Sequence, residues 1–193
     1  MKIILGFLIF CTGMATYSQK TYSNKAFGFT VIMPDDWNKS FFNENESVND
    51  AEKGYHQDSY YIANFTKTIS WNKDAVNSRI TVEASVNKQA GDFVAFKKTL
   101  EWSIENNIKP QYKNFSYKQK VAEITISGIK SLYSIFQYDF EMPNGTIAKV
   151  KNRMYIIPYK KYFFSIICID GQDEKYDSSK DFEAIIATLK IGE

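Results

Sequence analysis

The chain has 193 residues, of which 44% are hydrophobic and 16% aromatic, with only 4 prolines and 9 glycines. This composition is typical of a folded globular protein and excludes a disordered or collagen-like chain. The formal net charge of +2 is too small to predict a general attraction to nucleic acid, so we expect no nucleic-acid partner. We find no internal repeat and no linker, and the length therefore predicts one domain.

The first 18 residues have the pattern of a secretory signal peptide. Lys2 supplies the positive start, residues 3–10 the apolar core, and residues 16–18 a small-residue cleavage site, with cleavage after Ala15 as the alternative. The apolar run is too short to span a bilayer, so we expect no integral membrane span after cleavage. The sequence thus predicts an exported protein, periplasmic or extracellular, whose single domain covers residues 19–193.

The two cysteines bear on anchoring and on redox chemistry. Cys11 leaves a lipid-anchored lipoprotein open, although the bulky Phe10 stands where such signals usually place a small residue. After cleavage only Cys168 remains, which excludes an intramolecular disulfide. Cys168 lies in the most apolar stretch of the chain, where burial keeps a thiol protonated and makes a catalytic role improbable.

The N-terminal half predicts three strands and one long polar excursion. After a polar leader, residues 27–33 alternate apolar and polar side chains, and residues 59–68 and 79–86 form the next two strands. Trp37 follows the first strand and is expected to plug the end of the core. Residues 38–58 are rich in Asn, Glu, Asp and Ser, which makes them the best candidate for a mobile loop, and long loops of this kind are often functional or disordered.

Two helices are predicted, each with an N-terminal cap and an apolar stripe. Asp92 is expected to cap the first, and Ser178 opens the second, with Asp181 three residues on as in a capping box. The stripes are formed by Phe93, Phe96, Leu100 and Ile104, and by Phe182, Ile185, Ile186 and Leu189. Between the helices, residues 109–120 indicate a basic and aromatic connector, and residues 121–126 a further strand.

Residues 129–169 organise the fold as three β-like segments joined by two tight turns. The tripeptide Pro143-Asn144-Gly145 favours a hairpin turn. If these three residues form the loop, the pairs facing each other on one side of the sheet are Asp139 with Lys149, Gln137 with Lys151, and Ile135 with Arg153. A two-residue loop would instead place cations opposite phenylalanines. Because a slip of one residue exchanges the two faces, we predict the three-residue loop.

The third of these segments, residues 162–169, is apolar almost without alternation. Such a strand is covered on both faces, which places it near the middle of the sheet. A sheet covered on both sides within one small domain needs helices or loops on each face. We therefore predict an α+β fold, a three-layer α/β/α sandwich with a central, mainly antiparallel sheet.

Four stretches together resemble the PsbP/Mog1-like superfamily. They are Gly-Phe-Thr-Val at 28–31, Pro-Asp-Asp-Trp at 34–37, Ser-Gly-Ile-Lys at 127–130, and the closing helix at 182–190. The resemblance covers nearly all of the chain after the signal segment. It implies an antiparallel sheet between helical layers and a binding or accessory role in preference to catalysis. The family's metal-binding histidines and its GTPase partner do not transfer to an exported chain with one histidine.

The titratable residues of the polar excursion are the first candidate site. His56 is the only histidine, which excludes a His-paired metal site, and it lies near Asp58 and Glu52. A mixed site of these three could hold a weak cation, but the spacing does not demand one. We therefore predict no metal, no cofactor and no catalytic residue, and keep His56 and Asp58 as a weak candidate ligand surface.

Two basic features complete the candidate ligand surface. Lys113, Lys118 and Lys120 are interleaved with aromatic residues in the connector, and Lys149, Lys151 and Arg153 share one face of a strand. An anionic glycan or a membrane surface would suit the first group, but incidental surface lysines are the simpler interpretation. For the second group, a solvated face needs no function.

The sequence therefore predicts an exported, non-enzymatic binding or accessory protein. Its partner is an unknown protein or an envelope component, and peripheral association with a membrane stays open. The alternatives are an envelope hydrolase that uses loop carboxylates such as Asp35, Asp36 and Glu52, and the lipid-anchored lipoprotein.

Overall fold

The computed structural model describes residues 19–40, 59–68 and 76–192 of the chain. The expected signal segment, most of the polar excursion, and the candidates His56, Asp58 and Glu52 lie outside these ranges. None of the helices within them is both long and apolar enough to cross a membrane.

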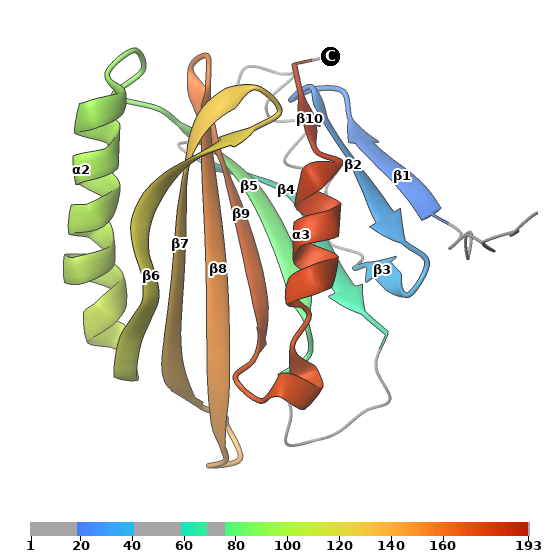
Figure 1. Ribbon diagram of the computed structural model, residues 1–193, viewed down its shortest axis with the longest axis vertical. Coiled ribbons are helices and arrows are strands. Elements are labelled where there is room, and N and C mark those ends of the chain that lie inside the picture. The colour runs from blue at the N-terminus through green and yellow to red at the C-terminus, as the bar shows by residue number, and fades with distance from the viewer. Residues whose placement is uncertain (1–18, 41–58, 69–75, 193) are drawn as a thin grey trace, which may run out of the picture.

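A seven-stranded sheet forms the centre of the molecule (Figure 1). Its strand order is β3-β4-β5-β9-β8-β7-β6, and every neighbouring pair is antiparallel. The strands are β3 (Trp37–Lys39), β4 (Ser59–Lys67), β5 (Arg79–Val86), β6 (Lys113–Ile126), β7 (Ile129–Glu141), β8 (Ile147–Tyr159) and β9 (Tyr162–Gly171). This arrangement confirms the expected α+β class with a mainly antiparallel sheet.

Strand β9 is the fourth of the seven strands, as its unbroken apolar run predicts. Phe164, Ile166 and Cys168 belong to the hydrophobic cluster on one face of the sheet. Phe163, Ile167 and Ile169 alternate with them and pack into the cluster on the other face. The central strand is therefore covered on both sides, which explains why it shows no polar alternation.

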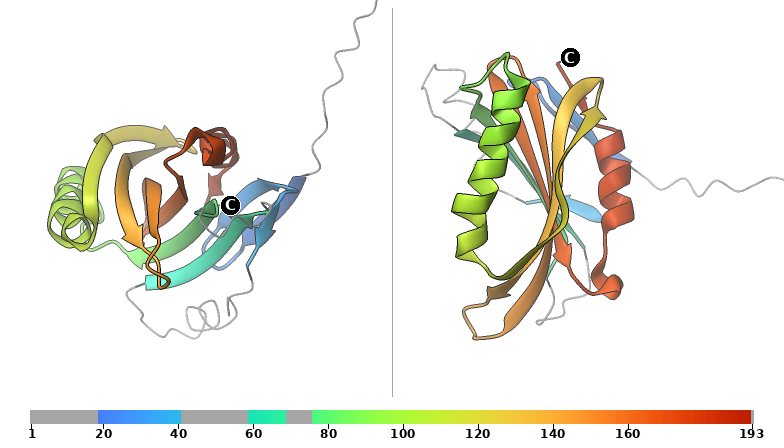
Figure 2. Two further views of the ribbon diagram at one scale, coloured as in Figure 1. Left: turned by 90° about the horizontal axis from the view of Figure 1, so that it is seen from below. Right: turned by 60° about the vertical axis from the view of Figure 1, so that its left-hand side comes forward.

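Helix α2 (Phe93–Ser103) covers one face of the sheet, and helix α3 (Ser179–Ala187) covers the other (Figure 2). Phe96 of α2 packs against side chains of β7 and β8, as does Ile104 of the following π-helical turn η1 (Ile104–Ile108). Phe182 and Ile185 of α3 belong to the opposite cluster, where each is at most 2% exposed. The predicted three layers are thus present.

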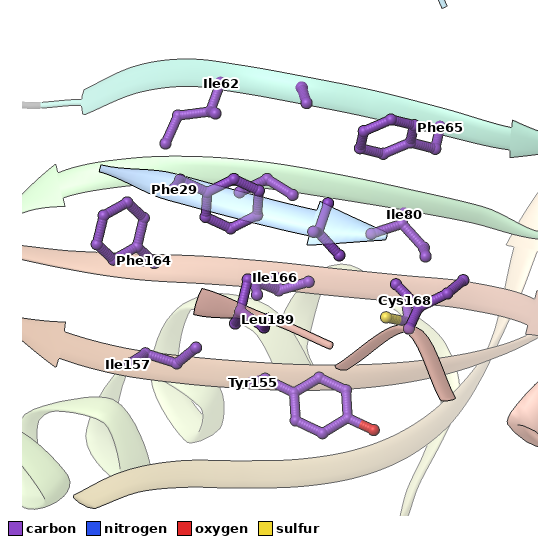
Figure 3. Close-up of a cluster of buried hydrophobic side chains, with 14 of the residues drawn as sticks. Phe29, Ile62, Phe65, Ile80, Tyr155, Ile157, Phe164, Ile166, Cys168 and Leu189 are labelled. Atoms are coloured by element: carbon purple, nitrogen blue, oxygen red, sulfur yellow. The ribbon is translucent and has the colours of Figure 1, made fainter. Parts of the chain in front are cut away.

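A second, smaller sheet shares the layer of α3, and this sheet was not predicted. It has the order β1-β2-β10, with strands β1 (Gln19–Asn24), β2 (Phe29–Pro34) and β10 (Lys190–Ile191). Figure 3 shows Phe29 of β2 among side chains from the large sheet. The interpretation of the segment before β2 as a polar leader is wrong, because β1 pairs with the whole of β2. Its mostly exposed side chains hide the strand from an alternation test.

The β7–β8 hairpin has the predicted register. Asp139 pairs with Lys149, and the Met142 N–H donates to the Thr146 carbonyl at 2.8 Å, which leaves a three-residue loop. Gly145 within this loop has φ +81°, a conformation that glycine adopts without steric cost. The hydrophobic pattern therefore sufficed to choose between the two possible loop lengths.

The two helix caps differ from each other. Asp92 caps α2 as expected, because its carboxylate accepts a hydrogen bond from the Ala95 N–H at 2.9 Å. The capping box predicted at Ser178 is wrong. The Ser178 hydroxyl makes no cap hydrogen bond and instead lies 2.7 Å from the Ser78 hydroxyl in the protein interior. Asp181 forms an ion pair with Lys67 of β4.

The basic connector predicted at residues 109–120 is mostly strand. After a short 3-10 turn, η2 (Lys109–Gln111), strand β6 begins at Lys113 and lies at the edge of the large sheet. Its pairing with β7 shifts register three times between Lys113 and Ala122. These bulges disrupt the two-residue alternation of apolar and polar side chains. The N-terminal part of the strand therefore could not be recognised from the sequence pattern.

Trp37 closes the core at the end of β2, as predicted. Its side chain is 2% exposed and lies edge-on to Phe182 of α3, with 5.7 Å between the ring centroids. The Pro-Asp-Asp-Trp corner thus ties the small sheet to the C-terminal helix.

Candidate functional site

Three segments that are far apart in the sequence meet at one end of the molecule and enclose a pocket of about 500 Å³. They are the β1–β2 turn, the β8–β9 turn, and the residue after β10, all at the upper end in Figure 1. We call this the terminal pocket. It is formed by residues 25–28 and 159–162, Phe164 and Gly192.

Backbone geometry fixes the lysines of the β8–β9 turn. Tyr159 pairs with Tyr162, so Lys160 and Lys161 are the two loop residues of a tight hairpin. Lys160 has φ +53°, which is uncommon for a residue other than glycine but suits a two-residue hairpin loop. The Lys161 carbonyl also accepts a hydrogen bond from the Asn87 N–H at 2.8 Å. The turn therefore places both lysines at the pocket from an ordered backbone.

Aromatic rings form the inner wall of the terminal pocket. Phe164 is 1% exposed and Phe27 is 8% exposed, and both belong to the hydrophobic core. The Tyr162 ring lies edge-on to Phe27 with 5.7 Å between centroids. Because these rings are held by core packing, the wall of the pocket is rigid.

Three exposed lysines line the terminal pocket. Lys160 Nζ lies 5.0 Å from the centroid of the Tyr159 ring, and Lys161 Nζ lies 5.1 Å from that of Tyr162, both within cation–π range. Lys25 is the third cation. Among residues 19–40, 59–68 and 76–192, no carboxylate forms an ion pair with any of the three. The pocket is thus a concave, locally cationic surface.

Gly192 completes the wall at a point where a side chain would not fit. Its N–H donates to the Gly28 carbonyl at 2.8 Å, which ties the C-terminal end of the chain to the β1–β2 turn. A Cβ atom on Gly192 would lie 2.8 Å from Tyr159 Cζ and closer still to its hydroxyl. With φ +98°, position 192 also favours glycine by conformation. Glycine at position 192 therefore leaves room for the Tyr159 ring, which would have to shift if this residue had a side chain.

No protein-family model matches the chain, and no curated protein matches it. Solved structures do match it. One match is LpqN, a Mycobacterium tuberculosis protein involved in cell envelope biogenesis. The match covers 91% of this chain and 91% of LpqN, with a TM-score of 0.57 and 12% sequence identity. For Synechocystis CyanoP, a cyanobacterial PsbP, the TM-score is 0.56 at 12% identity, with 94% of this chain and 97% of that one covered.

The yeast Ran-binding protein Mog1p, from Saccharomyces cerevisiae, matches with a TM-score of 0.52 at 9% identity over 91% of this chain and 96% of that one. The chain has the PsbP/Mog1-like fold. At these identities the likeness establishes the fold alone. The chain also spans about half, 48%, of a Bacteroides thetaiotaomicron protein, with a TM-score of 0.49 and 16% identity.

Two of the basic residues predicted on β8, Lys151 and Arg153, form ion pairs within the protein. Arg153 is 5% exposed, and its guanidinium donates to the fully buried Asp170 at 2.9 Å and to Asp177 at 3.3 Å. Lys151 donates to Asp177 at 2.7 Å. We call Lys151, Arg153, Asp170 and Asp177 the ion-pair network. Arg153 and Asp170 are buried, whereas Asp177 is exposed. The expectation of a solvated face is wrong for Arg153, because α3 and the segment before it cover that face.

The network shifts the pKa values of its carboxylates in opposite directions. Burial raises the pKa of Asp170, although Arg153 and the Ser178 N–H favour its ionised form. Burial opposes ionisation of Asp177 too, but hydrogen bonds from Lys151 and Ser179 outweigh it and hold the pKa of Asp177 well below its usual range. Asp170, Asp177 and Arg153 also form hydrogen bonds with Ser178 and Ser179, so the network contacts the N-terminal end of α3.

The other predicted lysines lie apart from the terminal pocket. Lys149 is exposed, and Lys113 on β6 flanks the same residue, Asp139 of β7, while pairing with Glu141 at 3.3 Å. Lys118 and Lys120 are exposed on β6. The structure thus brings Lys113 near Lys149 but does not unite the predicted lysines into one site.

Lys120 lines a smaller recess of about 250 Å³ between β6 and the end of α2. Glu101 and Glu105 line the same recess, so its lysine has acidic neighbours. Burial, together with Glu105, raises the pKa of Tyr117 in this recess to about 12. Because two carboxylates and one ammonium group line this recess, it is a weaker anion site than the terminal pocket.

The two carboxylates of the hydrolase alternative that the structure describes, Asp35 and Asp36, pair with different lysines. Asp35 lies 3.9 Å from Lys20, and Asp36 lies 3.6 Å from Lys67, so each forms an ion pair. The described residues contain no group of three or more His, Cys, Asp or Glu side chains placed to hold a metal ion. Cys168 is fully buried, and burial raises the pKa of its thiol, in agreement with the sequence.

Sequence reasoning did not find the lysines of the terminal pocket. The tetrapeptide Tyr159-Lys160-Lys161-Tyr162, with its symmetric order of aromatic and basic residues between two predicted strands, was the available signal. Nothing in the local sequence connects it with Lys25 and Phe27, which reach the pocket from the other end of the chain.

Proposed function

We propose that this protein is exported and acts in the periplasm or outside the cell as a non-catalytic binding or accessory protein, with the terminal pocket as its ligand site. Support comes from the signal-like pattern of residues 1–18 and from the fold that it shares with LpqN, which is involved in cell envelope biogenesis. The proposed partner is a protein or another component of the envelope.

One observation carries the choice of site: the three lysines of the terminal pocket have no carboxylate partner in the described part of the chain, whereas Lys151 and Arg153 are paired. Ammonium groups beside a rigid aromatic wall supply attraction and shape for an anionic ligand. The volume of about 500 Å³ is within the range of small-molecule sites, about 300–1,000 Å³.

Capture from envelope fractions of the native host tests the site. The bait is the tagged chain from Gln19 onward, compared with the variant Lys160→Gln/Lys161→Gln. We expect the unaltered chain to enrich an envelope component that the pocket variant does not. The control is Lys118→Gln/Lys120→Gln, which removes the same charge from exposed positions on β6 and should capture as the unaltered chain does. Equal capture by all three proteins would refute the proposed site.

The mass of the mature protein tests export and anchoring separately. Cleavage after Ser18 leaves Gln19 at the N-terminus, and cleavage after Ala15 leaves Thr16. Either mass, measured on protein recovered from the periplasm or the medium, supports export without a lipid anchor. An acylated N-terminal Cys11 establishes the lipoprotein instead, and an intact Met1 to Ser18 segment on all of the protein contradicts export.

A further inference from the structure

We propose that the terminal pocket binds a phosphate monoester carried on a ring-shaped or apolar body, either free in solution or as the headgroup of a membrane lipid. This inference rests on the proposed function, since it names the chemistry of the ligand of the same pocket.

The charge of the pocket favours a dianion. Lys25, Lys160 and Lys161 bring three positive charges to one opening, and two of them are neighbours in a two-residue loop. Like charges at this distance repel, and no carboxylate pairs with them among the described residues. A phosphate monoester carries about −1.5 to −2 charges at pH 7 and presents three strong acceptor oxygens. It therefore neutralises the lysines more completely than one carboxylate can.

The chemistry of lysine also suits phosphate. An ammonium group is a compact point charge with three donors, and it binds phosphate oxygens without requiring the planar match of an arginine fork. Lys160 and Lys161 have flexible side chains on a fixed turn, so their ammonium groups can converge on one tetrahedral anion. The lysines would supply the charge, and the turn would supply the position.

The aromatic wall indicates that the phosphate is attached to a body. Lys160 Nζ and Lys161 Nζ lie 5.0 and 5.1 Å from the ring centroids of Tyr159 and Tyr162. An anion held by these ammonium groups would therefore lie beside the two tyrosine rings, and the body that carries the anion would lie along the same pocket wall. A sugar ring, an aromatic ring or the glycerol portion of a lipid would bury apolar surface there.

Isothermal titration calorimetry with four small probes tests this inference on the chain from Gln19 onward. Phenyl phosphate has both features, phenyl sulfate and benzoate keep the ring with a single negative charge, and inorganic phosphate keeps the anion without the ring. We expect phenyl phosphate to bind at least about tenfold more tightly than each of the other three. Binding of phenyl sulfate or benzoate equal to that of phenyl phosphate would overturn the proposal.

Matched variants locate the binding. Lys160→Gln/Lys161→Gln should weaken phenyl phosphate binding by about tenfold or more, and Lys118→Gln/Lys120→Gln should leave it unchanged. Tyr159→Leu removes one ring and should reduce the preference for phenyl phosphate over inorganic phosphate while retaining inorganic phosphate binding. Circular dichroism of each variant confirms folding. Unchanged binding in the folded Lys160→Gln/Lys161→Gln variant would also overturn the proposal.

Vesicles distinguish the two sources of the phosphate group. One outcome is co-sedimentation of the protein with phosphatidylcholine vesicles that contain phosphatidic acid but not with vesicles of phosphatidylcholine alone. If Lys160→Gln/Lys161→Gln abolishes this co-sedimentation, the ligand is assigned as a lipid headgroup. Phenyl phosphate binding without vesicle binding assigns the site to a soluble ligand. Vesicle binding without phenyl phosphate binding refutes the phosphate site and indicates general surface attraction.

The two proposals fail in different ways. If envelope capture depends on Lys160 and Lys161 but phenyl phosphate does not bind, the pocket remains the ligand site and only its phosphate chemistry is refuted. If phenyl phosphate binds but capture is identical in all variants, the pocket chemistry stands and the proposed function fails.

Discussion

Strand β8 has cationic side chains in its middle and just beyond its end, and the two groups have opposite surroundings. Arg153 and Lys151 contact Asp170 and Asp177, and Arg153 is almost wholly buried. Lys160 and Lys161, in the turn that follows β8, are exposed and have no carboxylate partner in the described chain. The tertiary structure thus decides whether a cation stabilises the fold or is available to a ligand. Residue type and position along a strand do not by themselves decide this role.

The largest expected difference between the two groups concerns stability. Asp170→Ala leaves the Arg153 guanidinium buried without its main partner and removes the acceptor of the Ser178 N–H. Removing one member of a buried pair costs about 3–5 kcal/mol. We expect a loss of that size in urea unfolding of the chain from Gln19, followed by tryptophan fluorescence. A loss below about 1 kcal/mol would show that water already reaches Arg153.

A double replacement separates the net contribution of the Arg153–Asp170 pair to the free energy of unfolding from the cost of removing one partner. Arg153→Met with Asp170→Asn removes both charges and keeps an acceptor for the Ser178 N–H. Since an isolated buried charge is more costly than an apolar group of similar size, the double variant should recover most of the stability lost in Asp170→Ala. Urea unfolding of both variants measures this, and a double variant as unstable as the single one would contradict it.

Acid should weaken the ion-pair network through Asp177. The pKa of Asp177 is below its usual range in the folded protein, so the folded chain keeps this carboxylate ionised where the unfolded chain takes up a proton. Its contribution to stability is complete above about pH 4 and is lost as the pH falls further.

Asp177→Asn should therefore reduce the slope of stability against pH between about pH 4 and about pH 2, measured by thermal unfolding in a pH series. An identical slope in the variant and the unaltered chain would show that Asp177 does not contribute to acid sensitivity.

The smallest expected effect is that of the pocket lysines on stability. Lys160→Gln/Lys161→Gln removes two exposed cations that lie against the Tyr159 and Tyr162 rings. We expect the free energy of unfolding to change by less than about 1 kcal/mol. Lys118→Gln/Lys120→Gln is the matched control and should behave alike. A markedly larger loss at the pocket would mean that these lysines stabilise the fold, and the contrast with the network would disappear.

The sequence was sufficient wherever a pattern is local. Strand β5 was predicted with its exact bounds, and the β7–β8 register followed from keeping cations away from phenylalanines. The central position of β9 followed from its unbroken apolar run. In each case the side-chain period reports directly on which faces are covered.

The sequence was insufficient wherever partners come from distant segments. Arg153 pairs with Asp170, near the end of β9, and with Asp177, which follows β9, and no local rule predicts these pairings. The terminal pocket joins residues from both ends of the chain. Strand β1 shows no alternation because its outer side chains face solvent at a sheet edge. Most of the fold was therefore predictable, and the candidate site was not.

The pairing of β5 with β9 has a consequence for how the chain folds. Strands β7 to β9 each pair with the preceding strand. One edge of β5 pairs with β9, and the whole β6–β7–β8 meander lies between these two strands in the sequence. Such long-range pairing is slow, and an unpaired strand edge invites association with other chains. During synthesis β5 therefore has an open edge until nearly the last residues emerge, and a truncation before β9 should aggregate and not merely lose stability.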